Sequence, residues 1–137
     1  MMPRVMIRKM KFSDMEQLIE LMKRDGDHSL ALVPILLYLN KSADFNHAYI
    51  AHVNQAVVGF VFGQIVMGGE TLIPMYLYVA ENFRGKKIGK RLMCRLEQKS
   101  GCTTSQIYYN ASLHDYYAKQ NYFAGTGLEV AIKMLNP

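Results

Sequence analysis

Residues 77–92 read Leu-Tyr-Val-Ala-Glu-Asn-Phe-Arg-Gly-Lys-Lys-Ile-Gly-Lys-Arg-Leu, and this stretch decides the fold. A β-rich run ends in a short, basic, glycine-containing loop, which opens directly into an amphipathic helix. The first N–H groups of such a helix have no intrahelical partner and point one way, and the macrodipole adds partial positive charge. The order of strand, loop and helix therefore predicts an anion site built from backbone groups.

The charges in this stretch sharpen the prediction. Five cations crowd the expected helix start: Arg84, Lys86, Lys87, Lys90 and Arg91. Each cation is unfavourable near the positive end of the dipole by about 0.3–1 kcal/mol, and a bound polyanion such as a pyrophosphate would remove that conflict. Gly85 and Gly89 would let the backbone approach such a ligand closely. A solvated basic helix face is the alternative interpretation of the same residues.

The composition is that of one globular domain, and we expect a single domain over residues 1–137. Half of the 137 residues are apolar, and the net charge of +5 suits an anionic ligand. Residues 1–10 lack the apolar core of a signal peptide, and the longest apolar stretch, residues 56–67, is too short to span a bilayer. We therefore expect a cytoplasmic protein without a membrane partner.

Cysteine and histidine usage gives no sign of a disulfide framework or a metal site. Cys94 and Cys102 are the two cysteines, and we expect both to be reduced thiols. His47 and His52 are five residues apart on an expected strand, so they point to opposite faces. No metal is predicted.

Apolar periodicity predicts a mixed sheet with helices on both faces. Strands are expected at residues 5–10, 48–53, 56–67, 72–80, 106–110 and 128–135. Helices are expected from residue 13, within residues 30–40 with Pro34 near the start, over about 87–100 and over 112–120. The apolar run at residues 56–67 predicts a central strand that is covered on both sides. Residues 30–40 are also strongly apolar, which is compatible with burial, with the wall of a substrate pocket or with a subunit contact.

Local signals refine several of these elements. Ser13 and Glu16 predict a capping box at the first helix, and Asn121 suits a left-handed position after the last one. Residues 48–53 and 56–67 are expected to form a hairpin joined through Asn54 and Gln55. Pro74 predicts a bulge or an edge position in its strand. The expected core face of the helix from residue 13 consists of Met15, Leu18, Ile19 and Met22, and that of the helix over 87–100 consists of Ile88, Leu92, Met93 and Leu96. A Rossmann fold is not expected, since Lys87 stands where its fingerprint requires glycine.

Two motifs at this spacing resemble those of the GNAT superfamily of acyl-CoA-dependent N-acyltransferases, and the resemblance covers essentially the whole chain. The first is the pyrophosphate loop, [QR]-x-x-G-x-[GA], here Arg84-Gly85-Lys86-Lys87-Ile88-Gly89. Arg84 and Gly89 match, while Lys87 replaces the central glycine. The resemblance implies an α/β (α+β) GNAT fold, with a mixed, mostly antiparallel sheet of six to seven strands and helices on both faces.

The second motif runs from Asn110 to Tyr122. Family members commonly carry Asn seven residues before a Tyr, followed by Y-x-x-x-G-F. Asn110 and Tyr117 match, while Asn121 and Tyr122 replace Gly and Phe. The resemblance implies that Tyr117 is the catalytic residue, a general acid that protonates the departing thiolate. It assigns acetyl-CoA binding to Leu77, Tyr78, Val79, Arg84, Gly85, Lys86, Lys87, Ile88, Gly89, Lys90 and Asn110.

The expected reaction is direct attack of a primary amine on acetyl-CoA in a ternary complex. Some relatives carry a Glu base five residues before the Asn, where this chain has Ser105. Other candidates, each more typical of a structural role, are Glu70, Glu81, Tyr76, Tyr78, His47 and His52. We therefore predict that ordered water removes the proton, or that the amine arrives neutral.

Two alternatives to this enzyme remain. One is a GNAT-like domain that binds acyl-CoA with little or no catalysis. The other is a nucleic-acid-binding module, which we do not predict because no recognised motif accompanies the basic residues. The acceptor is expected to be a small-molecule or peptide amine that the sequence does not name, and the apolar segment at residues 30–39 is compatible with a homodimer.

Overall fold

The computed structural model of this chain describes residues 4–24, 47–109, 111–124, 131 and 133. The chain forms two compact units, Met1–Ile107 and Tyr108–Pro137, which are considered in turn. The expected strand at residues 128–135 and the apolar segment at residues 30–40 lie outside the described residues, except for Ala131 and Lys133.

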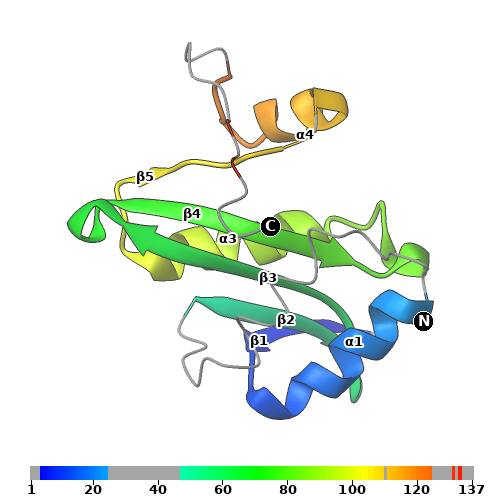
Figure 1. Ribbon diagram of the computed structural model, residues 1–137. Coiled ribbons are helices and arrows are strands. Elements are labelled where there is room, and N and C mark those ends of the chain that lie inside the picture. The colour runs from blue at the N-terminus through cyan, green and yellow to red at the C-terminus, as the bar shows by residue number, and fades with distance from the viewer. Residues whose placement is uncertain (1–3, 25–46, 110, 125–130, 132, 134–137) are drawn as a thin grey trace. The chain divides into compact units, whose positions relative to one another are not determined.

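The first unit contains a mixed sheet with strand order β1-β2-β3-β4-β5 (Figure 1). The strands are β1 Val5–Lys9, β2 Ala48–Val53, β3 Ala56–Val66, β4 Thr71–Val79 and β5 Thr104–Ser105. The first four pair antiparallel, and β5 pairs parallel with β4. The predicted mixed, mostly antiparallel sheet is confirmed, with five strands among the described residues against the six to seven expected.

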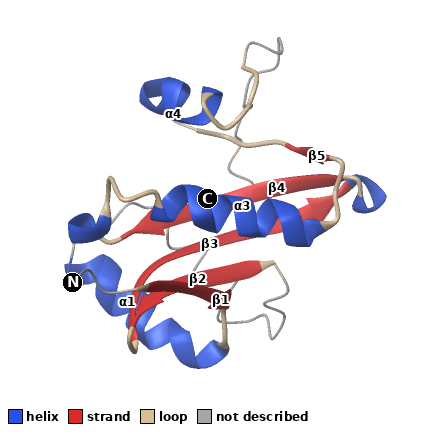
Figure 2. Cartoon of the chain, turned by 180° about the vertical axis from the view of Figure 1, so that it is seen from behind, coloured by secondary structure: helices blue, strands red, loops and turns tan. Residues whose placement is uncertain are grey.

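Two helices cover opposite faces of this sheet. They are α1 Met15–Arg24 and α3 Ile88–Ser100. Figure 1 shows α1 in front of the sheet, and Figure 2, from behind, shows α3 in front. A Cβ atom added to Gly59 would lie 3.4 Å from Leu92 Cδ1, and one added to Gly63 would lie 3.2 Å from Leu96 Cδ2. These two glycines of β3 therefore let α3 pack closely on the sheet.

The core lies on both sides of β3, as the unbroken apolar run predicts. Seven successive residues of this strand are buried, from Val57 to Gly63. The four residues expected to form the core face of α3 are all buried: Ile88, Leu92, Met93 and Leu96. The predicted hairpin between β2 and β3 is also confirmed, with Asn54 in the left-handed region at φ 54°.

The start of α1 differs from the prediction. Residues Phe12–Asp14 form a 3₁₀ turn, and the α-helix begins at Met15. The Asp14 carboxylate accepts the backbone N–H of Lys11 at 2.7 Å and both terminal nitrogens of Arg8 at 2.7 and 2.9 Å. Because this partly buried ion pair fixes the turn, the capping box predicted at Ser13 and Glu16 was wrong. The helix also buries Leu21, whereas Ile19 is only half-buried.

The strand after α3 is shorter and earlier than expected. Its two residues, Thr104 and Ser105, pair with Thr71 and Leu72. The N–H of Gln106 then donates to Leu72 O at 2.8 Å, and residues 106–109 are not in a strand. The strand predicted at residues 106–110 was therefore wrong in position.

The described part of the second unit is helical. A 3₁₀ turn, Ala111–Leu113, leads into α4, His114–Ala118, which is shorter than the helix predicted over residues 112–120. Asn121 has φ 69°, which confirms the left-handed position predicted for it.

Candidate functional site

The loop between β4 and α3 is a set of unpaired donors. A 3₁₀ turn, Glu81–Phe83, is followed by Arg84 and Gly85, and α3 begins at Ile88. The first N–H that makes a helical hydrogen bond is that of Arg91, which donates to Lys87 O at 3.0 Å. The six N–H groups of residues 85–90 find no acceptor among the residues that the structure describes. Such a row of free donors at a helix start is a site for a phosphate-like anion.

Lys87 keeps the backbone conformation that glycine would adopt. It has φ 64° and ψ 16°, in the left-handed region, and Gly85 two residues earlier has φ 77°. A left-handed residue with a Cβ atom costs about 1–2 kcal/mol. The loop is therefore formed in spite of the departure from the family motif.

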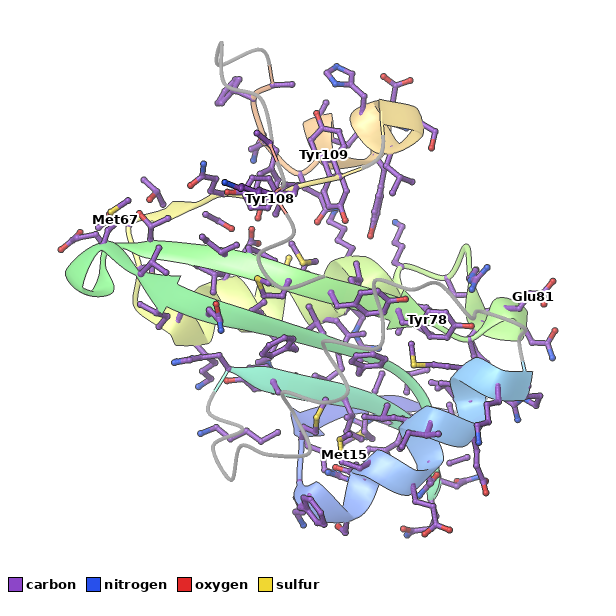
Figure 3. The ribbon with its side chains drawn as sticks, in the orientation of Figure 1. Met15, Met67, Tyr78, Glu81, Tyr108 and Tyr109 are labelled. Atoms are coloured by element: carbon purple, nitrogen blue, oxygen red, sulfur yellow. The ribbon has the colours of Figure 1, made fainter. Side chains whose placement is uncertain are left out.

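Arg84 ties the loop back to β4. Its Nε donates to Val79 O at 2.8 Å, and its Cζ lies 5.4 Å from the centre of the Tyr78 ring. Figure 3 labels Tyr78 on β4 and Glu81 in the turn that follows. The sequence marked Arg84 as a residue of the loop, but it did not predict this brace, because the contact depends on how the chain folds back.

Counting only the residues that the structure describes, the edge of β4 that faces β5 is unpaired along most of its length. Pairing with β5 involves only Thr71 and Leu72 among the described residues. Ala80 N–H donates to Val58 O on β3, at 2.7 Å. Backbone groups alternate in direction along a strand, so those of Leu77 and Val79 point away from β3. Both residues are among those to which the family resemblance assigned acetyl-CoA binding.

Pro74 lies at an irregularity of the same strand. The register with β3 shifts between Phe62, which pairs with Tyr76, and Gly63, which pairs with Pro74, so that Met75 is an extra residue. The bulge predicted at Pro74 is therefore confirmed. Bulges increase the local twist of a strand.

The candidate bases have structural contacts. The Glu70 carboxylate accepts Thr103 Oγ1–H at 3.0 Å, and His52 Nδ1 lies 2.7 Å from Asn54 O in the hairpin. Tyr76 and Tyr78 pack against Phe60, with ring centroids 5.6 and 6.4 Å apart. These contacts agree with the structural roles expected for these side chains.

Tyr117 lies in an aromatic cluster of the second unit. Its ring centre is 5.2 Å from that of Tyr109, 5.0 Å from Tyr116 and 5.8 Å from Tyr122. Tyr109 Oη lies 3.2 Å from His114 Nδ1. Burial, with a smaller contribution from Tyr116, raises the pKa of Tyr117 above the ordinary value of a phenol. The phenol therefore remains protonated across the physiological pH range.

Asn121 and Tyr122 position this ring through the end of α4. Tyr122 N–H donates to Tyr117 O at 3.2 Å, and Asn121 N–H donates to Ala118 O at 3.1 Å. With Asn121 in the left-handed region, these bonds form a Schellman motif. The motif brings the Tyr122 ring edge-on to Tyr117, with an interplanar angle of 80°. The substitutions of Gly and Phe in the family pattern thus preserve the turn and the aromatic contact.

The predicted site residues are distributed over both units. Leu77–Val79 and the loop of residues 84–90 lie in the first unit, and Tyr117 lies in the second. Asn110 lies outside the described residues. In the described ranges, no group of three or more His, Cys, Asp or Glu side chains could hold a metal ion, and no helix has the length and apolarity needed to cross a membrane.

A family model described as "Acetyltransferase (GNAT) domain" matches residues 44–122, which include the loop, the open strand edge and Tyr117. The chain belongs to the GNAT acetyltransferase family. No curated protein sequence matches it significantly.

Solved structures share the fold of this GNAT domain at low identity. An aminoglycoside acetyltransferase from an uncultured soil metagenomic sample is 18% identical, with TM-score 0.73 and 96% and 97% of the two chains covered. AAC(6')-Iy, in complex with the bisubstrate analog CoA-S-monomethyl-acetylneamine, is 17% identical, with TM-score 0.67 and 98% and 99% covered. The ribosomal-protein-alanine N-acetyltransferase of Brucella melitensis is 19% identical, with TM-score 0.67 and 96% and 99% covered. The expected GNAT fold is thereby confirmed.

Proposed function

We propose that this GNAT domain transfers an acetyl group from acetyl-CoA to a primary amine, by direct attack in a ternary complex. The row of six free N–H groups at residues 85–90 is the observation that carries the proposal. It offers donors to the pyrophosphate of CoA where the helix dipole also favours negative charge. The CoA complexes solved for AAC(6')-Iy, which has the same fold, support this choice of anion.

The open edge of β4 supports a role in holding the rest of the cofactor. The backbone groups of Leu77 and the N–H of Val79 could pair with the amides of the pantetheine arm, as an added strand would, while Val79 O accepts from Arg84 Nε. An N–H of this edge would also polarise the thioester carbonyl and stabilise the oxyanion that forms on attack. Because Arg84 joins the loop to Val79 O, the pyrophosphate site and this edge are held together.

Tyr117 is proposed as the general acid. A free thiol has a pKa of about 8.5 and a phenol about 10, so a protonated tyrosine can donate to the departing thiolate. The raised pKa of Tyr117 keeps that proton available. The proton balance closes if ordered water accepts the proton of the attacking ammonium, since the candidate bases Glu70, His52, Tyr76 and Tyr78 have structural contacts.

The acceptor is proposed to be a small-molecule or peptide amine. Two proteins of the same fold are named as aminoglycoside acetyltransferases and one as a ribosomal-protein-alanine N-acetyltransferase. At this low sequence identity the relatives share the fold, not necessarily the substrate. The assay should therefore use a panel of polyamines, aminoglycosides and peptide N-termini.

Thermal unfolding with acetyl-CoA tests the cofactor. Ligand at 100 times its Kd stabilises by ~2.7 kcal/mol, which for a domain of this size is roughly 5–12 °C in Tm. No shift at saturating acetyl-CoA or CoA would overturn the assignment.

Turnover of the amine panel then tests catalysis. Removing a positioned acid, as in Tyr117→Phe, should lower kcat by ~10²–10⁴ while leaving the CoA-induced shift intact. Tyr108→Phe is the matched control, since Tyr108 is 61% exposed (Figure 3). Equal rates for both variants would contradict the acid role. A CoA-induced shift without turnover of any amine would favour the alternative, an acyl-CoA-binding domain with little or no catalysis.

A further inference from the structure

A basic groove is lined by residues of α3 and by residues of β1 and β2. It consists of two adjoining hollows of about 380 and 440 Å³, both lined by Arg95. We define the basic groove by its six cations: Lys9, Lys87, Lys90, Arg91, Arg95 and Lys99. Only the first turn of α3 belongs also to the pyrophosphate loop, so most of the groove has no role in the proposed reaction.

Within the described ranges, the positive charge of the groove has no acidic partner. None of its six cations forms an ion pair with a described residue, and the salt bridge of Arg8 and Asp14 does not involve them. Like charges four residues apart on a helix are destabilising by about 0.2–0.5 kcal/mol per pair. Lys87, Arg91, Arg95 and Lys99 have this spacing. The fold does not require this row of charges, and an anionic partner would compensate it.

Two arginines are held across the groove toward the edge strand β1. Arg91 Nη2 donates to Val5 O at 3.1 Å, and Arg95 Nη1 lies 3.5 Å from Ile7 O. Each contact uses one of the five N–H donors of a guanidinium, so that most donors remain for a ligand. The guanidinium groups are thereby fixed before a partner binds, which reduces the entropy cost of binding.

The spacing of the cations fits an extended peptide. Residues four apart on a helix are separated by ~6 Å along its axis. Alternate side chains of an extended strand, which face the same side, are separated by ~6.6–6.8 Å. A peptide with a carboxylate at every second position can therefore place one opposite each of Lys87, Arg91, Arg95 and Lys99.

The lining of the groove favours a peptide over a nucleic acid. Single-stranded nucleic acids are commonly bound by exposed aromatic rings on which bases stack. Among the described residues, Tyr49 is the one Phe, Tyr or Trp that lines the groove, and it is only 3% exposed, while the one histidine there, His47, is half-buried. Ile7 and the aliphatic stems of the basic residues instead offer apolar contact between the charges. We propose that the basic groove binds an extended acidic segment of a partner protein.

Fluorescence anisotropy with a labelled peptide of alternating glutamate and threonine tests this directly. The double variant Arg95→Gln/Lys99→Gln should weaken binding by about tenfold, whereas Lys23→Gln/Lys119→Gln, which removes the same charge at exposed positions outside the groove, should not. A peptide of alternating glutamine and threonine should not bind. Lys9→Gln, across the groove, provides a second test in case the double variant fails to fold.

Several outcomes would overturn the proposal. Absence of peptide binding, or an equal loss in the two double variants, would mean that the groove is a solvated face. Tighter binding of a labelled single-stranded RNA at the same salt concentration would indicate a nucleic-acid site instead. If Arg95→Gln/Lys99→Gln weakened CoA but not dephospho-CoA, the groove would be part of the cofactor site. Because this binding is independent of acetyl transfer, the CoA shift and the amine panel separate its failure from that of the proposed enzyme.

Discussion

Lys87 offers the sharpest test of the loop. Its left-handed backbone conformation lowers the stability of the fold, whereas its charged side chain could contribute to the binding of CoA. Replacement by glycine should relieve the left-handed strain of ~1–2 kcal/mol and lose ~0.4–1 kcal/mol through the greater freedom of the unfolded chain. Replacement by alanine keeps a Cβ atom and therefore the strain. Both variants remove the same charge from the helix start. The free energy of unfolding of Lys87→Gly should thus exceed that of Lys87→Ala by about 0.8 kcal/mol.

Urea unfolding followed by circular dichroism measures this difference, which corresponds to roughly 2–4 °C in Tm for a chain of this length. A Lys87→Gly protein no more stable than Lys87→Ala would refute the left-handed conformation. The same pair decides what the lysine does for the ligand. If Lys87 contacts a phosphate of CoA, both variants should weaken CoA equally, and the salt dependence of binding should fall. If the side chain faces only solvent, both should bind CoA as the wild type does.

Three further predictions concern the ion pair, the close contact at Gly59 and the acid. Burial alone would raise the pKa of Asp14, but the hydrogen bonds from Arg8 and from the N–H of Lys11 outweigh it, so the pKa is lowered. The ion pair therefore stabilises the fold above the unfolded pKa of ~3.9, and this stabilisation is lost as pH falls through the folded pKa. Asp14→Asn should lower the free energy of unfolding by ~1.5–3 kcal/mol at pH 7, near the lower end because the Arg8 side chain is 37% exposed. A difference between variant and wild type that stayed constant down to pH 2 would contradict this. A Cβ atom at Gly59 would lie 2.9 Å from the carbonyl oxygen of Tyr78, so Gly59→Ala should lower the free energy of unfolding by ~1–3 kcal/mol, and an unchanged urea midpoint would exclude the close contact. Since the pKa of Tyr117 is raised, the decline of kcat that depends on it should lie above pH ~10, and a Tyr117-dependent decline at lower pH would oppose the assignment.

The sequence predicted the elements whose signals are local and periodic. The apolar run of β3, the hairpin turn at Asn54, the core face of α3 and the left-handed Asn121 each depend on residues close together in the chain, and each was found. The site loop was predictable for the same reason, since strand, loop and helix start are consecutive.

Other features depend on contacts that spacing does not contain. Ser13 and Glu16 satisfy the capping-box pattern, but the carboxylate of Asp14 is taken by Arg8 on β1. The position of β5 was wrong because a two-residue parallel pairing leaves no period in the sequence. The brace from Arg84 to Val79 O also joins residues of different elements. In each case the observed conformation depends on a contact between residues distant in the chain or in different elements, which local sequence preferences do not predict.

The unfavourable features of the loop are concentrated in one short segment. Left-handed strain at Lys87, six unsatisfied N–H groups and several cations at the positive end of the dipole all occur between residues 84 and 91. A helix selected for stability alone would have glycine at the cap and carboxylates in its first turn. Violations of local rules that coincide in this way are expected at functional sites. Because a bound pyrophosphate would satisfy the donors and neutralise the cations together, it accounts for both groups of unfavourable contacts with a single ligand.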